Sequence, residues 1–288
     1  GLSYVDDNDA SWTGVPLKFP RIQGGDICGI IAQVGEGVEQ DRIGTRTIVR
    51  AMQNIPTKEN PLAMQTMGSE VDGGFAQYCV AKAKESFPIN CDWSDVELAS
   101  IPISYSTAEG MLCRADIQKE TILITGASGG VGSAAIQLAK VRGAKIIAQC
   151  APDKASALKE LGADQTVYRN DDLVSVLGEN SVDAVVDLVG GSSWPQLLDI
   201  LRPGGKYVSS GAIAGPIVDL DLRSLYLKDL TLIGSTVNDA YVFENVIHCI
   251  EEGQIKPLVA QSFPLKEIHK AQKVFMEKKF IGKLVLIP

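Results

Sequence analysis

The sequence is short of the residues that build metal clusters and disulfide frameworks. Its 288 residues contain two histidines and six cysteines, and no two cysteines form a C-x-x-C pair. Because this spacing provides no closely spaced set of zinc ligands, we predict no tightly held metal. Scattered cysteines are typical of reduced thiols, which predicts a cytoplasmic protein.

The chain also lacks a long apolar run and an excess of positive charge. No apolar stretch approaches the roughly 20 residues of a transmembrane helix, and no signal peptide opens the chain. Lys and Arg number 27 against 35 Asp and Glu, a net charge of -8. Such a balance disfavours general binding to nucleic acid or acidic membranes. We therefore expect a small-molecule substrate, with no nucleic acid and no membrane partner.

What the sequence does contain is a glycine-rich turn, Gly126-Ala-Ser-Gly-Gly-Val-Gly132, between a predicted strand and a helix predicted over 130–142. Glycines let the backbone approach a pyrophosphate, and a helix N-terminus offers N–H groups and a favourable dipole. Ala127 stands where the strict fingerprint has its first glycine, but the order strand, turn, helix favours a dinucleotide site over a turn without ligand. The predicted contacts are Ala127, Ser128, Gly129, Gly130, Val131 and Gly132.

Strands and helices alternate between residues 104 and 238, which is typical of an α/β fold with a doubly wound parallel sheet. The predicted strands lie at 121–126, 145–150, 182–189, 206–210 and 229–235. Residues 1–103 contain mostly strands and loops. Their strands are expected at 27–34, 46–50 and 75–81, with an irregular stretch at 51–74. After residue 239 a helix and a strand–helix–strand tail break the alternation.

Cofactor choice is set at the end of the second strand of the alternating region. An acidic residue there would bind the ribose hydroxyls of NAD, but the end of this strand carries Gln149. Basic residues near a missing carboxylate favour NADP, and Lys154, Tyr168 and Arg169 are the candidates for its 2′-phosphate. Asp153 is the counter-argument, since it could bind the ribose instead. Turns after later strands lie where such sheets bind ligand, and their candidates beside the nicotinamide are Val189, Gly190, Ser210 and Gly211.

The glycine-rich run and both chain ends resemble the medium-chain dehydrogenase/reductase superfamily. The similar stretches are residues 126–140, 20–38, Gly44-Thr-Arg46, 264–271 and Gly282-Lys-Leu-Val-Leu-Ile-Pro288. The resemblance implies a mostly-β GroES-like substrate domain built from residues 1–103 and 239–288. A Rossmann dinucleotide-binding domain, residues 104–238, would be inserted between these segments. The resemblance also implies hydride transfer to or from a nicotinamide cofactor.

Two departures from the family pattern concern zinc. Zinc-dependent members have Gly-His-Glu where this chain has Gly24-Gly25-Asp26, so Gly25 replaces a zinc-ligand histidine. Their four-cysteine zinc lobe would fall near residues 52–74, which contain no cysteine. The chain is therefore more similar to the metal-free branch of quinone oxidoreductases and enoyl reductases. Without a Lewis acid, reduction should favour an activated acceptor, a quinone or an α,β-unsaturated carbonyl.

A further departure concerns the N-terminus. The family has several dozen residues before the position of Gly1, so the resemblance implies an N-terminally incomplete substrate domain. Quinone oxidoreductases carry a Gly-Leu-Tyr segment that places a tyrosine near the nicotinamide, and Gly1-Leu-Ser-Tyr4 is similar. Tyr4 is accordingly the candidate for a substrate hydrogen bond or a proton donor.

Two other functions stay open from the sequence. One is a zinc-type alcohol or carbonyl dehydrogenase, and the other is an NADP-binding protein without catalysis, since a fold alone does not establish activity. The apolar strand predicted at 229–235 is expected at a sheet edge. Because an exposed edge invites pairing with another chain, we predict a homodimer.

Overall fold

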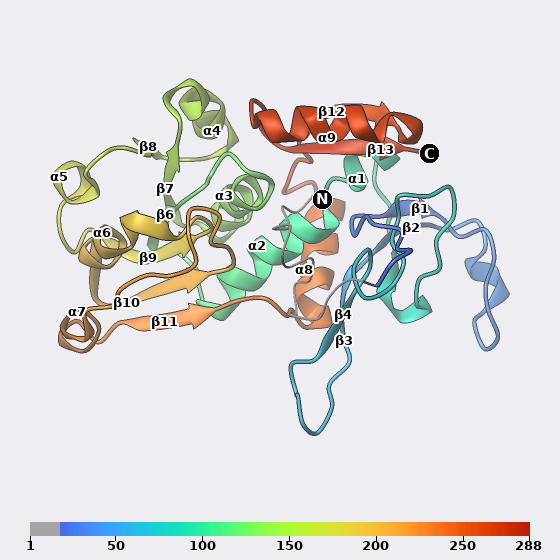
Figure 1. Cartoon of the computed structure of the whole chain (residues 1–288), viewed down its shortest axis with the longest axis horizontal. Coiled ribbons are helices and arrows are strands. Elements are labelled where there is room, and N and C mark those ends of the chain that lie inside the picture. Colours follow the sequence, from blue (N-terminus) through green and yellow to red (C-terminus); the bar gives the residue numbers. More distant parts are fainter. Residues whose placement is uncertain (1–17) are drawn as a thin grey trace. The chain divides into compact units, whose positions relative to one another are not determined.

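The computed structural model describes residues 18–288 (Figure 1). Its contacts divide the chain into two compact units. We call residues Thr107–Thr236 the central unit and the two flanking segments, Gly1–Ser106 and Val237–Pro288, the terminal unit. Within residues 18–288 no helix is long and apolar enough to cross a membrane.

The central unit contains one parallel sheet of six strands in the order β11-β10-β9-β6-β7-β8. The most buried strand residues lie in the middle of this sheet, because β6 and β9 are covered on both faces. Ile122, Leu123 and Ile124 of β6 are all 0% exposed. The predicted doubly wound sheet is thereby confirmed. The strands are β6 (Thr121–Ile124), β7 (Lys145–Cys150), β8 (Gln165–Tyr168), β9 (Val182–Asp187), β10 (Leu201–Ser209) and β11 (Thr231–Gly234).

Helices connect these strands in two groups (Figure 1). One group is α3 (Gly130–Arg142) packed on α4 (Ala155–Leu161), and the other is α5 (Leu173–Leu177), α6 (Trp194–Asp199) and α7 (Leu222–Leu227). The helix predicted over 130–142 is confirmed, and it ends at Gly143, whose φ of 83° suits glycine. Its residues from Gly132 to Ala139 are buried, whereas Val141 near its C-terminal end is 41% exposed.

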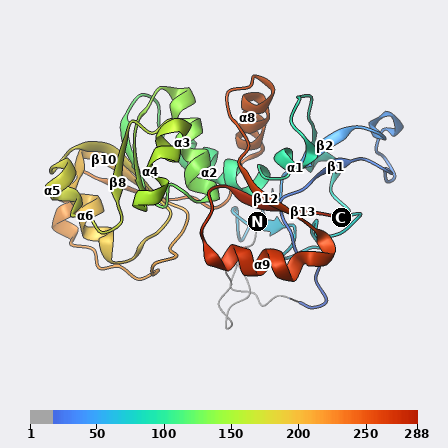
Figure 2. The same cartoon turned by 90° about the horizontal axis from the view of Figure 1, so that it is seen from above.

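Within the described residues, the terminal unit contains small β-sheets and several α-helices. Figure 2 shows α9 (Ile268–Glu277) lying along β12 (Val259–Pro264) and β13 (Lys283–Ile287), which pair in parallel. The other strands are antiparallel: β1 (Cys28–Ile30), β2 (Arg46–Val49) and β5 (Ser86–Pro88) in one sheet, β3 (Met52–Asn54) and β4 (Met64–Thr66) in a hairpin. The remaining helices are α1 (Asp95–Leu98), α8 (Ala240–Glu251) and, across the unit boundary, α2 (Pro102–Arg114).

Two sequence predictions in this unit are wrong. Residues 75–81 form no strand, and Tyr78 and Val80 are 80% and 93% exposed. Alternation makes a strand only where another strand can pair with it, and within residues 18–288 none does. Conversely, the stretch 51–74 is not wholly irregular, because it contains the hairpin of β3 and β4.

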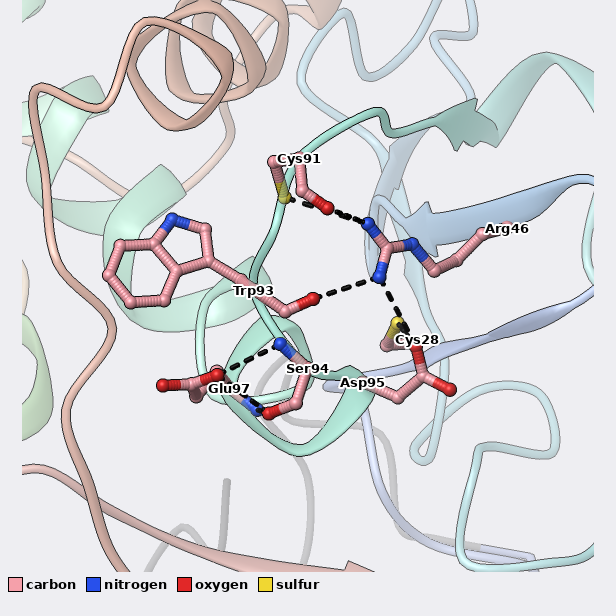
Figure 3. Close-up of polar contacts among 7 residues, drawn as sticks. All are labelled: Cys28, Arg46, Cys91, Trp93, Ser94, Asp95 and Glu97. Carbon is pink, nitrogen blue, oxygen red and sulfur yellow. Dashed lines mark hydrogen bonds and ion pairs between the residues drawn. The ribbon is translucent and has the colours of Figure 1, made fainter.

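Arg46 joins β2 to the segment that leads into α1 (Figure 3). Its Nη1 donates to the carbonyl oxygen of Trp93 at 2.8 Å, and its Nη2 donates to the carbonyl oxygen of Cys91. Ser94 then begins α1 with a capping box, accepting from the N–H of Glu97 while the Glu97 carboxylate accepts from the N–H of Ser94. The arginine of the Gly-Thr-Arg motif therefore has a structural task, fixing the chain ahead of α1 and α2.

Candidate dinucleotide site

The glycine-rich turn lies where β6 ends and α3 begins, and its shape depends on two glycines. Gly126 has φ +57°, and the N–H of Gly129 donates to its carbonyl oxygen at 3.0 Å. A Cβ at Gly132 would lie 2.4 Å from the Gly126 oxygen and 2.6 Å from the Cα of Ala127. Because both obstacles are backbone atoms, only glycine permits this turn to lie against the helix.

The first turn of α3 offers the donors that a pyrophosphate requires. Gly130, Val131 and Gly132 open the helix, where N–H groups have no intrahelical acceptor and the helix dipole favours an anion. The N–H of Ala127 differs, because it already donates to the Gln149 carbonyl oxygen at 3.2 Å. Ser128 is only 5% exposed. The groups of the turn that stay available are therefore mainly backbone N–H groups at the start of the helix.

The basic candidates lie together at one flank of the sheet. Cys150 and Tyr168 pair in register at the ends of β7 and β8, so Arg169 follows directly beside Ala151. Burial raises the pKa of the Cys150 thiol, with Asp153 adding to the rise and the charges of Arg169 and Lys154 opposing it. Lys154 thus follows β7 and Arg169 follows the neighbouring strand β8, and the end of β7 carries Gln149 where an acid would bind ribose. Asp153 also follows β7, so ribose binding by its carboxylate, the alternative to a 2′-phosphate site, stays open.

The other flank carries the turns predicted beside the nicotinamide. The turn after β9 contains Val189 and Gly190, and a Cβ at Gly126 would lie 3.1 Å from Cγ2 of Val189. The N–H of Ser210, after β10, donates to the Asp187 carbonyl oxygen at 3.3 Å. Gly211 lies against Leu188. The carboxyl ends of the strands therefore present, in spatial order, the basic flank, the glycine-rich turn and these two turns.

Three residues at this edge were missed by sequence reasoning. The carboxylate of Asp187, 0% exposed, accepts from the hydroxyls of Thr125 and Tyr207. The available sequence signal was a charged residue, Asp187, at the end of the apolar strand β9. That signal could not identify Thr125 and Tyr207, because Thr125 follows β6 and Tyr207 lies in β10.

The residues around Gly25 do not fit a zinc ion. A Cβ there would meet Cδ1 of Ile103 at 2.5 Å, the carbonyl oxygen of Met67 at 3.2 Å and Cβ of Ala51 at 3.5 Å, so the described side chains beside it are apolar and leave no room for a larger residue. Neighbouring Asp26 pairs with Lys283 at 2.9 Å and accepts from the N–H of Ile103 at 2.7 Å. In the part of the chain that the structure describes, no three His, Cys, Asp or Glu side chains gather to hold a metal. Tyr4 lies outside the described residues.

Two family models match the chain. The alcohol dehydrogenase GroES-like domain matches residues 1–91, and the zinc-binding dehydrogenase model matches residues 130–252. The acryloyl-coenzyme A reductase of Metallosphaera sedula is 29% identical over 281 residues, covering 94% of this chain and 84% of that protein. The quinone oxidoreductase of Rattus norvegicus is 24% identical over 288 residues, covering 93% and 80%.

Solved structures are similar over nearly the whole chain. A protein of Sinorhizobium meliloti 1021, assigned as an alcohol dehydrogenase, has a TM-score of 0.89 at 45% identity, covering 94% of this chain and 77% of that one. The 2-octenoyl-CoA carboxylase reductase CinF, solved with NADP and 2-octenoyl-CoA, has a TM-score of 0.83 at 26% identity, covering 92% and 68%.

Proposed function

Because the chain belongs to the medium-chain dehydrogenase/reductase superfamily, we propose that it reduces quinones or α,β-unsaturated carbonyl compounds with hydride from NADPH and without zinc. It is an oxidoreductase of this superfamily with relatives of the enone and quinone reductase type. Acryloyl-CoA and 2-octenoyl-CoA, named for two similar proteins, are both α,β-unsaturated thioesters. The conjugated carbonyl of such acceptors makes the β-carbon electron-poor without a metal.

The chain's own residues would bind and orient the reactants. NADPH, when bound, supplies the hydride. The first turn of α3 would hold the pyrophosphate, Lys154 and Arg169 the 2′-phosphate, and the turns at 188–191 and 210–211 the nicotinamide. A proton must then reach the α-carbon or the oxygen of the acceptor, and we assign this step to Tyr4 or water. Residues 104–238 would thus serve the cofactor and residues 1–103 with 239–288 the substrate.

The observation that carries the choice of NADPH is the pair of cations at a strand end that lacks an acid. We expect the variant Lys154→Ala/Arg169→Ala to bind NADPH about tenfold or more weakly, because two charge-assisted contacts to the 2′-phosphate are lost. NADH binding should stay unchanged, since NADH has no such phosphate. Lys159→Ala, an exposed lysine on α4, is the matched control. Equal losses for both cofactors would contradict the assignment.

Activity without zinc has a separate test. Metal-depleted protein should oxidise NADPH with a panel of quinones and enones as fast as untreated protein. A requirement for stoichiometric zinc would instead support an alcohol or carbonyl dehydrogenase. Tight NADPH binding without turnover of any acceptor would support a non-catalytic nucleotide-binding protein.

We also propose a homodimer in the cytoplasm. Strand β11 is a sheet edge, and an exposed edge favours pairing. The segment leading into it exposes the apolar side chains of Ile213, Ile217, Leu222, Tyr226 and Leu227. Light scattering should give twice the chain mass, and Ile217→Asp/Leu227→Asp should give the monomer. A monomer at all concentrations would contradict the dimer. The six free cysteines are consistent with a reducing compartment.

A further inference from the structure

We propose that Asp187 is a positioning residue that fixes the turn at 188–191, so that the turn can bind the nicotinamide end of the cofactor. The proposal rests on the proposed function, because it assumes that NADPH binds at this sheet edge. Asp187, Thr125 and Tyr207 all lie outside the glycine-rich turn at 126–132.

The Asp187 carboxylate, at the end of β9, accepts hydrogen bonds from residues of the adjacent strands β6 and β10 or directly after them, and from its own turn. Thr125, directly after β6, donates its hydroxyl to Oδ1 at 2.5 Å, and the hydroxyl of Tyr207 in β10 donates to Oδ2. The N–H of Val189 donates to Oδ1 at 3.0 Å, and the N–H of Gly190 lies 3.2 Å and 3.1 Å from the two oxygens. A buried carboxylate needs such donors, because burial of an unpaired charge is costly.

Thr125 completes this arrangement. Its hydroxyl oxygen accepts from the N–H of Leu188 at 2.9 Å while its hydrogen is donated to Asp187. Three consecutive N–H groups, those of residues 188–190, are therefore engaged by two side chains. These N–H groups are then engaged, whereas the carbonyl oxygens of the turn have two lone pairs each, including that of Val189, which accepts from Ala214. Carbonyl oxygens complement the NH₂ group of a carboxamide. The cofactor carries an NH₂ group on the nicotinamide carboxamide and another on adenine, and in the proposed pose it is the carboxamide that lies beside this turn.

The turn at 188–191 also contacts the glycine-rich turn and the segment that follows β10. The side chain of Val189 is next to Gly126 of the glycine-rich turn. The Val189 carbonyl oxygen accepts from the N–H of Ala214 at 2.9 Å, and the N–H of Gly191 donates to Gly215 at 3.1 Å. Through these contacts a shift of the 188–191 turn would move the segment after β10 as well.

Tyr207 acts as a donor in this network. Burial, together with the hydrogen bond to Asp187, raises the pKa of its phenol well above the usual value. The phenol therefore stays protonated at neutral pH and stabilises the Asp187 carboxylate. It is a poor source of a catalytic proton, so its role is structural support of the turn.

The test compares two variants of Thr125 that differ in one hydroxyl. Thr125→Val keeps the shape but loses both the donor to Asp187 and the acceptor for Leu188, whereas Thr125→Ser keeps the hydroxyl. Each is titrated with NADPH and with adenosine 2′,5′-bisphosphate, a probe of the phosphate end without nicotinamide. We expect NADPH binding or kcat to fall about tenfold or more in Thr125→Val, with the bisphosphate affinity within about twofold of wild type. Thr125→Ser should restore NADPH binding and kcat.

Each other result has one meaning. Equal NADPH affinity and kcat in Thr125→Val and Thr125→Ser would overturn the positioning role, as would equal losses for NADPH and the bisphosphate in a folded variant. If Thr125→Val does not fold, Tyr207→Phe takes its place and is compared with wild type. It removes one donor to Asp187 but leaves every N–H partner of the turn in place, so we expect a smaller loss of NADPH affinity, with the bisphosphate affinity unchanged. NADPH affinity and kcat equal to wild type would then overturn the positioning role. Failure of wild-type protein to bind NADPH would instead contradict the proposed function, and it is seen before any variant is made.

Discussion

The guanidinium of Arg50 lies 2.7 Å from the carboxylate of Glu85, and only 7% and 3% of these two side chains are exposed. The same guanidinium donates to Oδ1 of Asn54 at 3.0 Å and to the carbonyl oxygen of Asn238 at 2.9 Å. Arg50 therefore connects the end of β2 with segments far apart in the sequence. Its charge is satisfied inside the terminal unit, where an unpaired charge would be unfavourable.

We predict that Glu85→Gln lowers the free energy of unfolding by about 3 kcal/mol, because it leaves the Arg50 charge buried without its partner. Arg50→Met/Glu85→Leu should be less destabilising than the sum of its single variants, since neither charge then stays buried alone. Urea denaturation gives the free energy of unfolding of wild type, of Glu85→Gln, and of the double variant with its two single variants. A loss below about 0.5 kcal/mol, the range of ordinary surface changes, would contradict the prediction.

The two glycines of the turn should respond differently to alanine. At Gly129 the nearest atom to a new Cβ is the Gly126 oxygen at 3.4 Å, so Gly129→Ala should change the apo stability by no more than about 0.5 kcal/mol. Its Cβ should nevertheless weaken NADPH binding about tenfold, because it blocks close backbone approach to the pyrophosphate. Gly132→Ala should lower apo stability by about 1–3 kcal/mol through overpacking. Thermal melts with and without NADPH distinguish the pair, and identical behaviour would refute the division of roles.

The apolar packing at Gly25 predicts a compensating pair. Gly25→Ala brings a Cβ to 2.5 Å from Cδ1 of Ile103, which should cost about 1–2 kcal/mol of stability. Ile103→Val removes that terminal carbon, so the double variant should be more stable than the sum of the single changes predicts. Strict additivity in chemical denaturation would show that Ile103 does not limit this position.

The thiol of Cys28 should make stability fall at high pH. Burial, with Asp95 next in importance, raises its pKa to about 12, although Arg46 opposes the rise. The folded protein therefore holds this proton more tightly than the unfolded chain does. The resulting stabilisation is complete below the ordinary thiol pKa of about 8.5 and is lost as pH rises toward the folded value.

Denaturant unfolding at pH 8 and pH 10.5 tests this linkage. Wild-type protein should lose more stability between these pH values than Cys28→Ala, which lacks the group. Cys113→Ala is an internal comparison, because burial and Glu109 raise the pKa of that thiol to about 11. An identical pH dependence for wild type and Cys28→Ala would exclude a contribution from Cys28.

Local sequence patterns predicted the central unit well. The strand at 145–150 and the helix at 130–142 have the predicted bounds in β7 and α3, because a continuous apolar run and a capped periodic run are each decided locally. The strand predicted at 206–210 begins earlier, at Leu201, with a register shift before Lys206. The run Pro203-Gly204-Gly205 inside β10 is a turn signal in the sequence, and it concealed that start. A local turn signal does not show whether a neighbouring strand pairs across it.

By itself, the sequence determined the alternating α/β order, the glycine-rich turn at 126–132 and the absence of an acid at Gln149. These depend on residue type and short-range spacing, which the chain carries wherever it folds. Only the tertiary structure decided that residues 75–81 remain unpaired among the described residues, that Lys154 and Arg169 follow neighbouring strands, and that Asp187 binds Thr125 and Tyr207. Each of these depends on which distant segments lie side by side, which local spacing does not encode. At Asp187, burial away from water also requires that the carboxylate has hydrogen-bond donors.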